Sequence, residues 1–196
     1  MPRKYELVRQ TRETSIRVMV MVDGKGKYSV KTQVGFLNHL LETFARHGFF
    51  DIEVEATGDI VTGAHHLAED VGIVLGGAFG GALKKGGGIK RFGWALIPMD
   101  ESLAQVAVDL SGRPLLVCDK SIPVVEIGGM TTYDFYEFLK GFALSLPMTL
   151  HVSCKGEDPH HMMEAVMKAL ARSLDEATSI DRRLEGQPPS TKGVLL

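Results

Sequence analysis

The sequence predicts an α+β protein built by internal duplication of one strand-strand-helix-strand-helix unit, with two sheets packed against helices. A His-His-x-x-Glu sequence occurs twice, at residues 65–69 and 160–164, and each copy opens a helix-like apolar stretch. The order of alternating and helical segments is also the same before and after residue 90. The 196 residues are 44% hydrophobic, which suffices for an ordinary core. We expect two repeat halves, residues 1–90 and 91–196, that form one functional unit.

The first half contains each element of the unit once. Residues 13–22 alternate as in a half-buried strand, residues 23–26 (DGKG) form a hairpin turn, and residues 28–34 are the returning strand. Residues 36–46 have helical spacing, and Gly48 ends that helix. Residues 49–56 alternate again. A helix over 64–83 then follows, up to a break at the glycines of residues 86–88.

The second half repeats this order. Residues 102–110 and 115–119 are strands joined by a turn, 133–146 a helix, 148–153 a strand, and a last helix runs from the second doublet to about residue 178. Alignment of the halves pairs Glu13 with Glu101 and His39 with Glu137. A duplicated unit of this kind predicts two half-sites related by a pseudo-twofold axis.

Composition excludes several classes of protein. The net charge of -2 provides no basic surface for nucleic acid or anionic lipid. Two cysteines, Cys118 and Cys154, are too few for a disulfide framework and suit a reducing compartment. No apolar run approaches 18 residues, and the first four residues do not lead into a signal-peptide segment. We expect a soluble cytoplasmic protein with neither nucleic-acid nor membrane partners.

The two doublets predict metal binding. Residues four apart share one face of a helix, so His65 can bind an ion together with Glu69, and His160 together with Glu164. Imidazole and carboxylate ligands suit divalent first-row metals such as manganese, iron or zinc. The alternative, two helix starts with exposed histidines, is disfavoured because the glutamate keeps its register in both copies.

Pseudo-symmetry assigns eight ligands to two ions. The second histidine of each doublet points about a quarter-turn away and reaches the other ion if the two helices face each other. His151 competes with Glu137 for one position, but Glu137 is favoured because its repeat partner His39 fits the other site. One ion would be held by His65, Glu69, His161 and Glu137, and the other by His160, Glu164, His66 and His39.

The stretches TGAHHLAEDVGIVLG (62–76), PMDESLA (98–104) and DPHHMMEA (158–165), with eight more along the chain, resemble the imidazoleglycerol-phosphate dehydratase family of histidine biosynthesis. The resemblance implies a ribosomal protein S5 domain 2-like fold in two halves, a 24-subunit homo-oligomer with active sites at subunit contacts, and two Mn²⁺ ions per site. The stretches cover nearly the whole chain: ETSI (13–16), GFLNHLLE (35–42), ARHGFFD (45–51), TGAHHLAEDVGIVLG (62–76), RFG (91–93), PMDESLA (98–104), DLSGRP (109–114), TLHV (149–152), DPHHMMEA (158–165), KALARSL (168–174) and PSTKG (189–193).

The resemblance also implies roles for single residues. The family's ligand positions are those derived above, although the family often has histidine where this chain has Glu137. Glu13 matches the substrate-contacting acid that handles protons. The phosphate-binding positions fall on Arg91, Arg113, Ser190, Thr191 and Lys192, the last three in a C-terminal substrate-binding tail.

Five further residues are considered because of their positions in the sequence. Lys168 lies four residues after Glu164, which favours a substrate contact over a solvated lysine. His47 either contacts substrate or caps its helix, and His151 either supports the ligands or contacts substrate. Asp100 and Glu101 either orient ligands or simply start a strand.

The implied reaction converts D-erythro-imidazole-glycerol phosphate to imidazole-acetol phosphate. Two ions facing each other suit an imidazole ring with two nitrogens. If both ring nitrogens bind metal ions, the ring becomes an imidazolate, which can expel the hydroxyl of the attached carbon to give a diazafulvene-like intermediate. Loss of the neighbouring proton then yields an enol that tautomerises to the ketone. A dinuclear metallohydrolase and a metal-storage or structural assembly protein are the competing functions. A hydrolase would release phosphate, whereas a dehydratase retains it.

Overall fold

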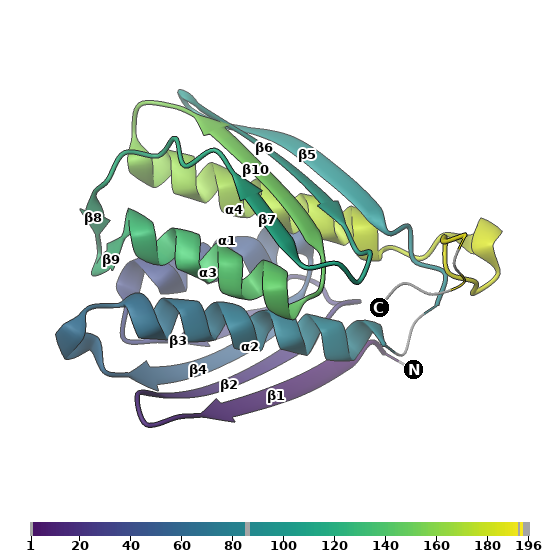
Figure 1. The fold of residues 1–196 in the computed structure, drawn as a ribbon, viewed down its shortest axis with the longest axis horizontal. Coiled ribbons are helices and arrows are strands. Elements are labelled where there is room, and N and C mark those ends of the chain that lie inside the picture. Colours follow the sequence, from purple (N-terminus) through teal and green to yellow (C-terminus); the bar gives the residue numbers. More distant parts are fainter. Residues whose placement is uncertain (1, 85–86, 192, 194–196) are drawn as a thin grey trace.

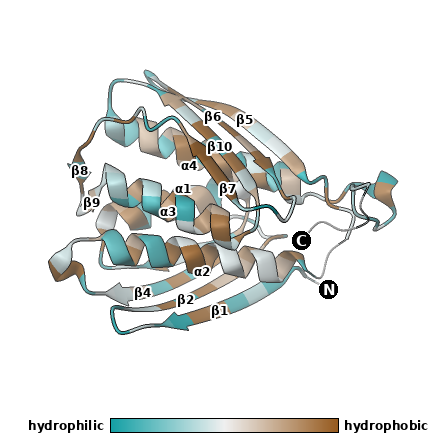
Figure 2. Cartoon of the chain, viewed as in Figure 1, coloured by the Kyte–Doolittle hydropathy of each residue, from teal (hydrophilic) through white to brown (hydrophobic). Residues whose placement is uncertain are grey.

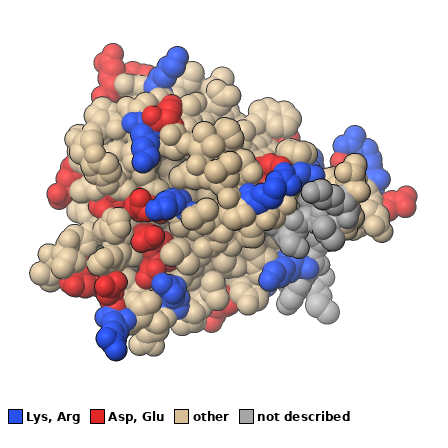
Figure 3. All heavy atoms as spheres, viewed as in Figure 1, with Lys and Arg blue, Asp and Glu red and all other residues tan. Residues whose placement is uncertain are grey.

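The computed structural model describes residues 2–84, 87–191 and 193. It contains two four-stranded sheets and four long helices (Figure 1). None of the helices in these residues is both long and apolar enough to cross a bilayer. On the face of the molecule drawn in Figure 3, acidic and basic side chains are interspersed, without a broad surface of one sign.

The first half forms one sheet and two helices. The strand order is β1-β2-β4-β3, with β3 parallel to β4 and the other pairs antiparallel. The elements are β1 (Lys4–Gln10), β2 (Thr14–Met21), β3 (Tyr28–Lys31), α1 (Gly35–Gly48), β4 (Asp51–Gly58), the short 3₁₀ helix η1 (Ile60–Thr62) and α2 (His65–Leu83).

The second half has the same arrangement, with strand order β5-β6-β10-β7 and β7 parallel to β10. A two-stranded hairpin, β8 with β9, precedes its first helix. The elements are β5 (Phe92–Met99), β6 (Ser102–Asp109), β7 (Leu115–Cys118), β8 (Glu126–Ile127), β9 (Met130–Thr131), α3 (Thr132–Ser145), β10 (Thr149–Lys155), α4 (Pro159–Thr178) and the 3₁₀ helix η2 (Arg182–Leu184).

The pairing register is identical in the two sheets. Met19 pairs with Glu53 in the first sheet, and their repeat counterparts Ala107 and His151 pair in the second. Register is normally set by the pattern of buried side chains, since a slip of one residue would turn every side chain to the other face. The shared register confirms the predicted duplication and the α+β fold class. The division at residue 90 stays a prediction.

The four helices lie between the two sheets (Figure 1). α2 packs on β1 and β2, α4 packs on β5 and β6, and the halves meet where α2 contacts α3 and α1 contacts α4. Apolar residues of both sheets and all four helices form one continuous core, and Figure 2 shows them along the central strands. At its centre the ring of Phe79 meets those of Phe44, Phe50 and Phe142 edge to face.

Each sheet has one more strand than the predicted unit contains. β1 is almost wholly exposed along its length, so its sequence lacks the alternation that burial imposes on a strand. β5 is also an edge strand and contains Pro98, a residue that favours edges.

Residues 32–34, predicted to continue a strand, instead lead into α1. Gly48 does end α1, but the left-handed residue that follows is Phe49, with φ 57°. The predicted break at residues 86–88 includes Gly86, which lies outside the described residues.

Glycines allow α2 and α3 to approach each other closely. A Cβ atom at Gly72 would lie 2.3 Å from the carbonyl oxygen of Phe138, and one at Gly141 would lie 2.6 Å from that of Glu69. Because these neighbours are backbone atoms in helices, they cannot move aside independently. The contact places the first doublet on α2 beside the helix that contains Glu137.

We therefore expect Gly72→Ala to reduce the free energy of unfolding by about 1–3 kcal/mol through overpacking. Urea denaturation measures this change. Gly80→Ala on the same helix is the matched control, since its Cβ would meet nothing closer than the Ser145 carbonyl oxygen at 3.8 Å. Alanine should stabilise that position by up to about 1 kcal/mol through helix propensity. Equal effects of the two substitutions would contradict the packing explanation.

Candidate metal centre

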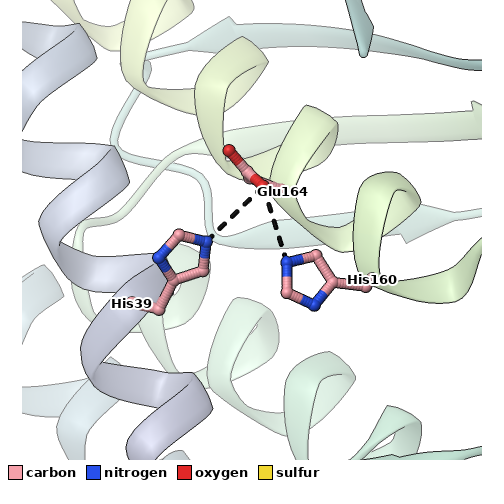
Figure 4. Close-up of side chains that lie close together, drawn as sticks. All are labelled: His39, His160 and Glu164. Carbon is pink, nitrogen blue, oxygen red and sulfur yellow. Dashed lines mark ion pairs between the residues drawn. The ribbon is translucent and has the colours of Figure 1, made fainter. Parts of the chain in front are cut away.

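Three predicted ligands meet where α1 faces the start of α4. Nε2 of His39 lies 3.5 Å from Oε2 of Glu164, and Nε2 of His160 lies 3.7 Å from the same oxygen (Figure 4). The candidate ligand atoms of the three residues lie within 4.8 Å of one another. His160 and Glu164 are one helical turn apart, as the sequence predicts, and His39 comes from the neighbouring helix.

Local packing fixes these side chains. Asp158 caps α4 by accepting a hydrogen bond from the His160 amide at 2.8 Å, and Pro159 suits the first helical position. The ring of Phe36 lies 4.9 Å from that of His160 and 6.2 Å from that of His39. Sequence reasoning missed Phe36, although its position one helical turn before His39 indicates a shared face.

Glu164 is buried and remains ionised. Burial raises its pKa, but the hydrogen bond and charge of Lys168, together with His39, outweigh burial and hold the pKa below the ordinary value. The Lys168 ammonium lies 2.7 Å from Oε1, so Oε2 is left to face the two histidines. The expected position of Lys168 beside Glu164 is confirmed.

The chemistry of this donor set fits a divalent metal ion. Two imidazole nitrogens and one carboxylate oxygen converge, and three protein ligands leave coordination positions for further groups. Within the described residues, no other group of three or more histidine, cysteine or carboxylate side chains brings its candidate ligand atoms this close together.

The equivalent residues of the first half lie on α2 and α3 but are more dispersed. Nδ1 of His65 lies 3.8 Å from Oδ1 of Asp134, a buried residue of the α3 capping box. Glu137 accepts a 2.8 Å hydrogen bond from Lys140, and this bond and charge, with a further contribution from Glu69, raise the pKa of Lys140. A cation therefore lies beside Glu137, one of the predicted ligands.

The second histidine of each doublet turns away from its own doublet. Nδ1 of His66 lies 3.7 Å from Oε2 of Glu13, and Nδ1 of His161 lies 3.0 Å from Oε2 of Glu101. Hydrogen bonds, first that from His161 and then those from the Asp158 amide and Ser102, lower the pKa of Glu101 to about 2, and the contact with Glu101 raises the pKa of His161. The single chain does not assemble the mixed ligand sets, which stay predictions.

The predicted phosphate-binding arginines gather around Asp109. Nε of Arg91 lies 2.7 Å from this carboxylate, and Nη2 of Arg113 lies 3.4 Å from it. Arg91 also donates to the carbonyl oxygen of Pro189 at 3.0 Å, which places the tail with Ser190 and Thr191 next to it. Lys192 lies outside the described residues.

This arginine group lies far from the metal centre within one chain. The Arg91 amide donates to the carbonyl oxygen of Ala177, in the last turn of α4, whereas His160 is in the first turn. The 17 steps along the helix from His160 to Ala177 correspond to about 25 Å. The substrate that the family resemblance implies, with three carbons between ring and phosphate, would not bridge that distance.

The two remaining histidines occupy different environments. His47 is in the last turn of α1, where its carbonyl oxygen accepts a hydrogen bond from Arg172 at 3.4 Å, and partial desolvation and the positive charge of Lys168 lower the pKa of His47. His151 is exposed on β10 in a depression that also includes Cys118 and Asp119, on the outer face of the second sheet. It is thus on the far side of that sheet from the helices.

The fold and the centre together define a duplicated α+β protein with a histidine and carboxylate centre at the start of a helix. The family described as Imidazoleglycerol-phosphate dehydratase matches residues 32–174. The Imidazoleglycerol-phosphate dehydratase of Thermoanaerobacter pseudethanolicus is 50% identical over 194 residues, which is 98% of this chain and 100% of the relative. That of Bacillus velezensis is also 50% identical, with the same coverage.

Two solved structures have the same fold. The Staphylococcus aureus imidazoleglycerol-phosphate dehydratase superposes with a TM-score of 0.82 and 34% identity, covering 91% of this chain and 99% of the other. The Pyrococcus furiosus enzyme, in complex with (S)-C348, gives 0.82 and 37%, covering 96% and 100%. The chain belongs to the imidazoleglycerol-phosphate dehydratase family. It is an enzyme, a dehydratase of the hydro-lyase class.

Proposed function

We propose that this enzyme dehydrates D-erythro-imidazole-glycerol phosphate to imidazole-acetol phosphate in histidine biosynthesis, in the cytoplasm and with two manganese ions per active site. Family membership supports the substrate. The convergence of His39, His160 and Glu164 on one point supports the metal dependence, because this donor set suits a divalent ion and Glu164 remains a carboxylate.

The ligands proposed for each ion come from two chains. In one chain, His39, His160 and Glu164 provide one half-site, and His65, Glu69 and Glu137 provide its pseudo-symmetric counterpart. His66 and His161, which turn away from these groups, would complete the half-sites of neighbouring copies. When bound, the two ions would polarise both nitrogens of the substrate imidazole.

The protein's own residues would direct the elimination. Loss of hydroxide from the carbon next to the ring gives a diazafulvene-like intermediate, whose neighbouring C–H bond is then acidic. Glu13, whose side chain is 58% exposed beside His66, would remove that proton to give the enol. Lys168, which pairs with Glu164 and keeps it ionised, would contact the substrate at the metal centre. Arg91 and Arg113 would bind the phosphate.

The separation of the two groups of residues supports assembly. Since the metal centre and the arginine group lie at opposite ends of α4, one substrate molecule would need the metal centre of one chain and the arginines of another. We propose a homo-oligomer of 24 subunits with active sites at subunit contacts, as the family resemblance implies.

Metal removal and restoration test this function directly. After chelation the enzyme should lose its activity, and added Mn²⁺ should restore formation of the ketone while two ions bind per chain. The assay follows imidazole-acetol phosphate, free phosphate and metal content in one sample. Release of phosphate would instead indicate a hydrolase, and bound metal without either product would indicate a structural role.

A further inference from the structure

The carboxylate of Glu101, at the start of β6, is held by three donors. Its Oε1 accepts hydrogen bonds from the amide of Asp158 at 3.0 Å and from the hydroxyl of Ser102 at 2.8 Å. Its Oε2 lies 3.0 Å from Nδ1 of His161. Ser102 is itself 1% exposed and Asp158 caps α4, so the carboxylate is fixed between a strand and the helix that contains His161.

The repeat counterpart of Glu101 is held differently. Glu13 occupies the equivalent position before β2, but its carboxylate is 58% exposed, against 31% for Glu101. The distance from Glu13 to Nδ1 of His66 is 3.7 Å, too long for a hydrogen bond. Across the described residues, the Glu13 carboxylate accepts no hydrogen bond. Two glutamates in equivalent positions have therefore acquired different surroundings.

We propose that Glu101 is a positioning residue that keeps His161 in the form that binds metal, whereas Glu13 stays free to exchange protons with substrate. This inference rests on the proposed metal-dependent function. A neutral imidazole has one N–H donor and one bare nitrogen. A carboxylate that accepts from Nδ1–H leaves the lone pair of Nε2 for a metal ion and fixes the orientation of the ring.

The neighbouring carboxylates do not substitute for Glu101. Oδ2 of Asp100 lies 3.8 Å from Nε2 of His161, and Oδ2 of Asp158 lies 4.0 Å from Nδ1. Both distances exceed that of a hydrogen bond. Glu101 alone therefore contacts the ring nitrogen directly among the acidic groups around His161.

The test is Glu101→Gln, which is isosteric. The amide oxygen can still accept from Asp158 and Ser102, which leaves the NH₂ group facing Nδ1. Nδ1 must then be the acceptor, and the ring proton moves to Nε2. We expect one of the two Mn²⁺ ions to bind about 10–100-fold more weakly, with the other unchanged. Loss of the electron paramagnetic resonance signal of free Mn²⁺ during titration measures both affinities, and thermal melting of the metal-free protein checks the fold.

Two controls distinguish positioning from general support. Ser102→Ala removes one of the two donors to Oε1 of Glu101 and leaves Oε2 beside His161, so it should lower the melting temperature and weaken neither Mn²⁺ ion as much as Glu101→Gln does. Glu157→Gln removes the charge of the residue before Asp158 and should change neither the melting temperature nor the Mn²⁺ affinities. Wild-type affinities in Glu101→Gln, or an equal loss in Ser102→Ala, would overturn the role of Glu101. If the unmodified enzyme bound no manganese at all, the proposed metal dependence would itself fail, and this role with it.

Discussion

Glu164→Gln should nearly abolish the dehydratase activity. Removal of a residue that only supports a metal ligand typically costs 10–100-fold in metal affinity, so loss of a ligand should cost more than about 100-fold. The amide would also leave Lys168 without its ion-pair partner in a partly buried position. Activity at saturating substrate, measured with increasing Mn²⁺, gives both the maximum rate and the metal requirement.

The control for this variant lies on the same helix. Glu176→Gln removes a carboxylate near the end of α4 that pairs only loosely with Lys90, at 3.8 Å. It should retain wild-type metal affinity and rate. Full activity of Glu164→Gln at micromolar Mn²⁺ would contradict the assignment of the metal centre, whereas parallel losses in both variants would indicate damage to α4.

Two inactive variants should restore activity to each other when they are co-expressed. His160→Ala removes a proposed metal ligand and Arg113→Ala removes an exposed residue proposed to bind phosphate, so each protein alone should be almost inactive. If every site takes its metal centre from one chain and its arginines from another, random mixing leaves about one quarter of the sites intact. Specific activity of the purified mixed assembly measures this fraction.

The matched control combines two defects in one half-site. Co-expression of His160→Ala with His39→Ala should restore almost nothing, because every His39–His160–Glu164 centre would still lack one histidine. A mixture of His160→Ala and Arg113→Ala that remained as inactive as its components would contradict sites shared between chains. It would then require the arginines of the same chain to reach the metal centre by a large rearrangement.

Much of the fold is predictable because it depends on local patterns. The 3.6-residue period places His160 and Glu164 on one face, and the structure has both in one cluster with His39. Two edge strands were missed because neither shows the alternation of polar and apolar residues expected of a half-buried strand. β1 is exposed along most of its length although α2 packs on it, and β5 is apolar on both faces, with Phe92, Trp94 and Leu96 exposed. The duplication itself was visible, since it appears as a repeat of whole segments.

The candidate site was less accessible from the sequence because parts of it depend on contacts between distant segments. No local pattern shows that Phe36 packs against His160, or that Glu101 contacts His161 across the turn before α4. Helices α2 and α4 do not face each other within the chain, and the grouping of His65 with His161 therefore needs a second copy. Spacing along the sequence predicts which residues share one face of a helix. It does not predict which chain provides the residues opposite that face.

The contacts between helices also indicate an origin for the chain. α1 and α3 are equivalent in the repeat, as are α2 and α4, so the two contacts between the halves, α1 with α4 and α2 with α3, are repeat-equivalent, with α2–α3 the more extensive. That reciprocity is the signature of an isologous dimer. A half-length ancestor would expose the apolar faces of both its helices until it paired with its own copy. Gene fusion would have turned that pair into one polypeptide, freeing two once-identical glutamates to diverge.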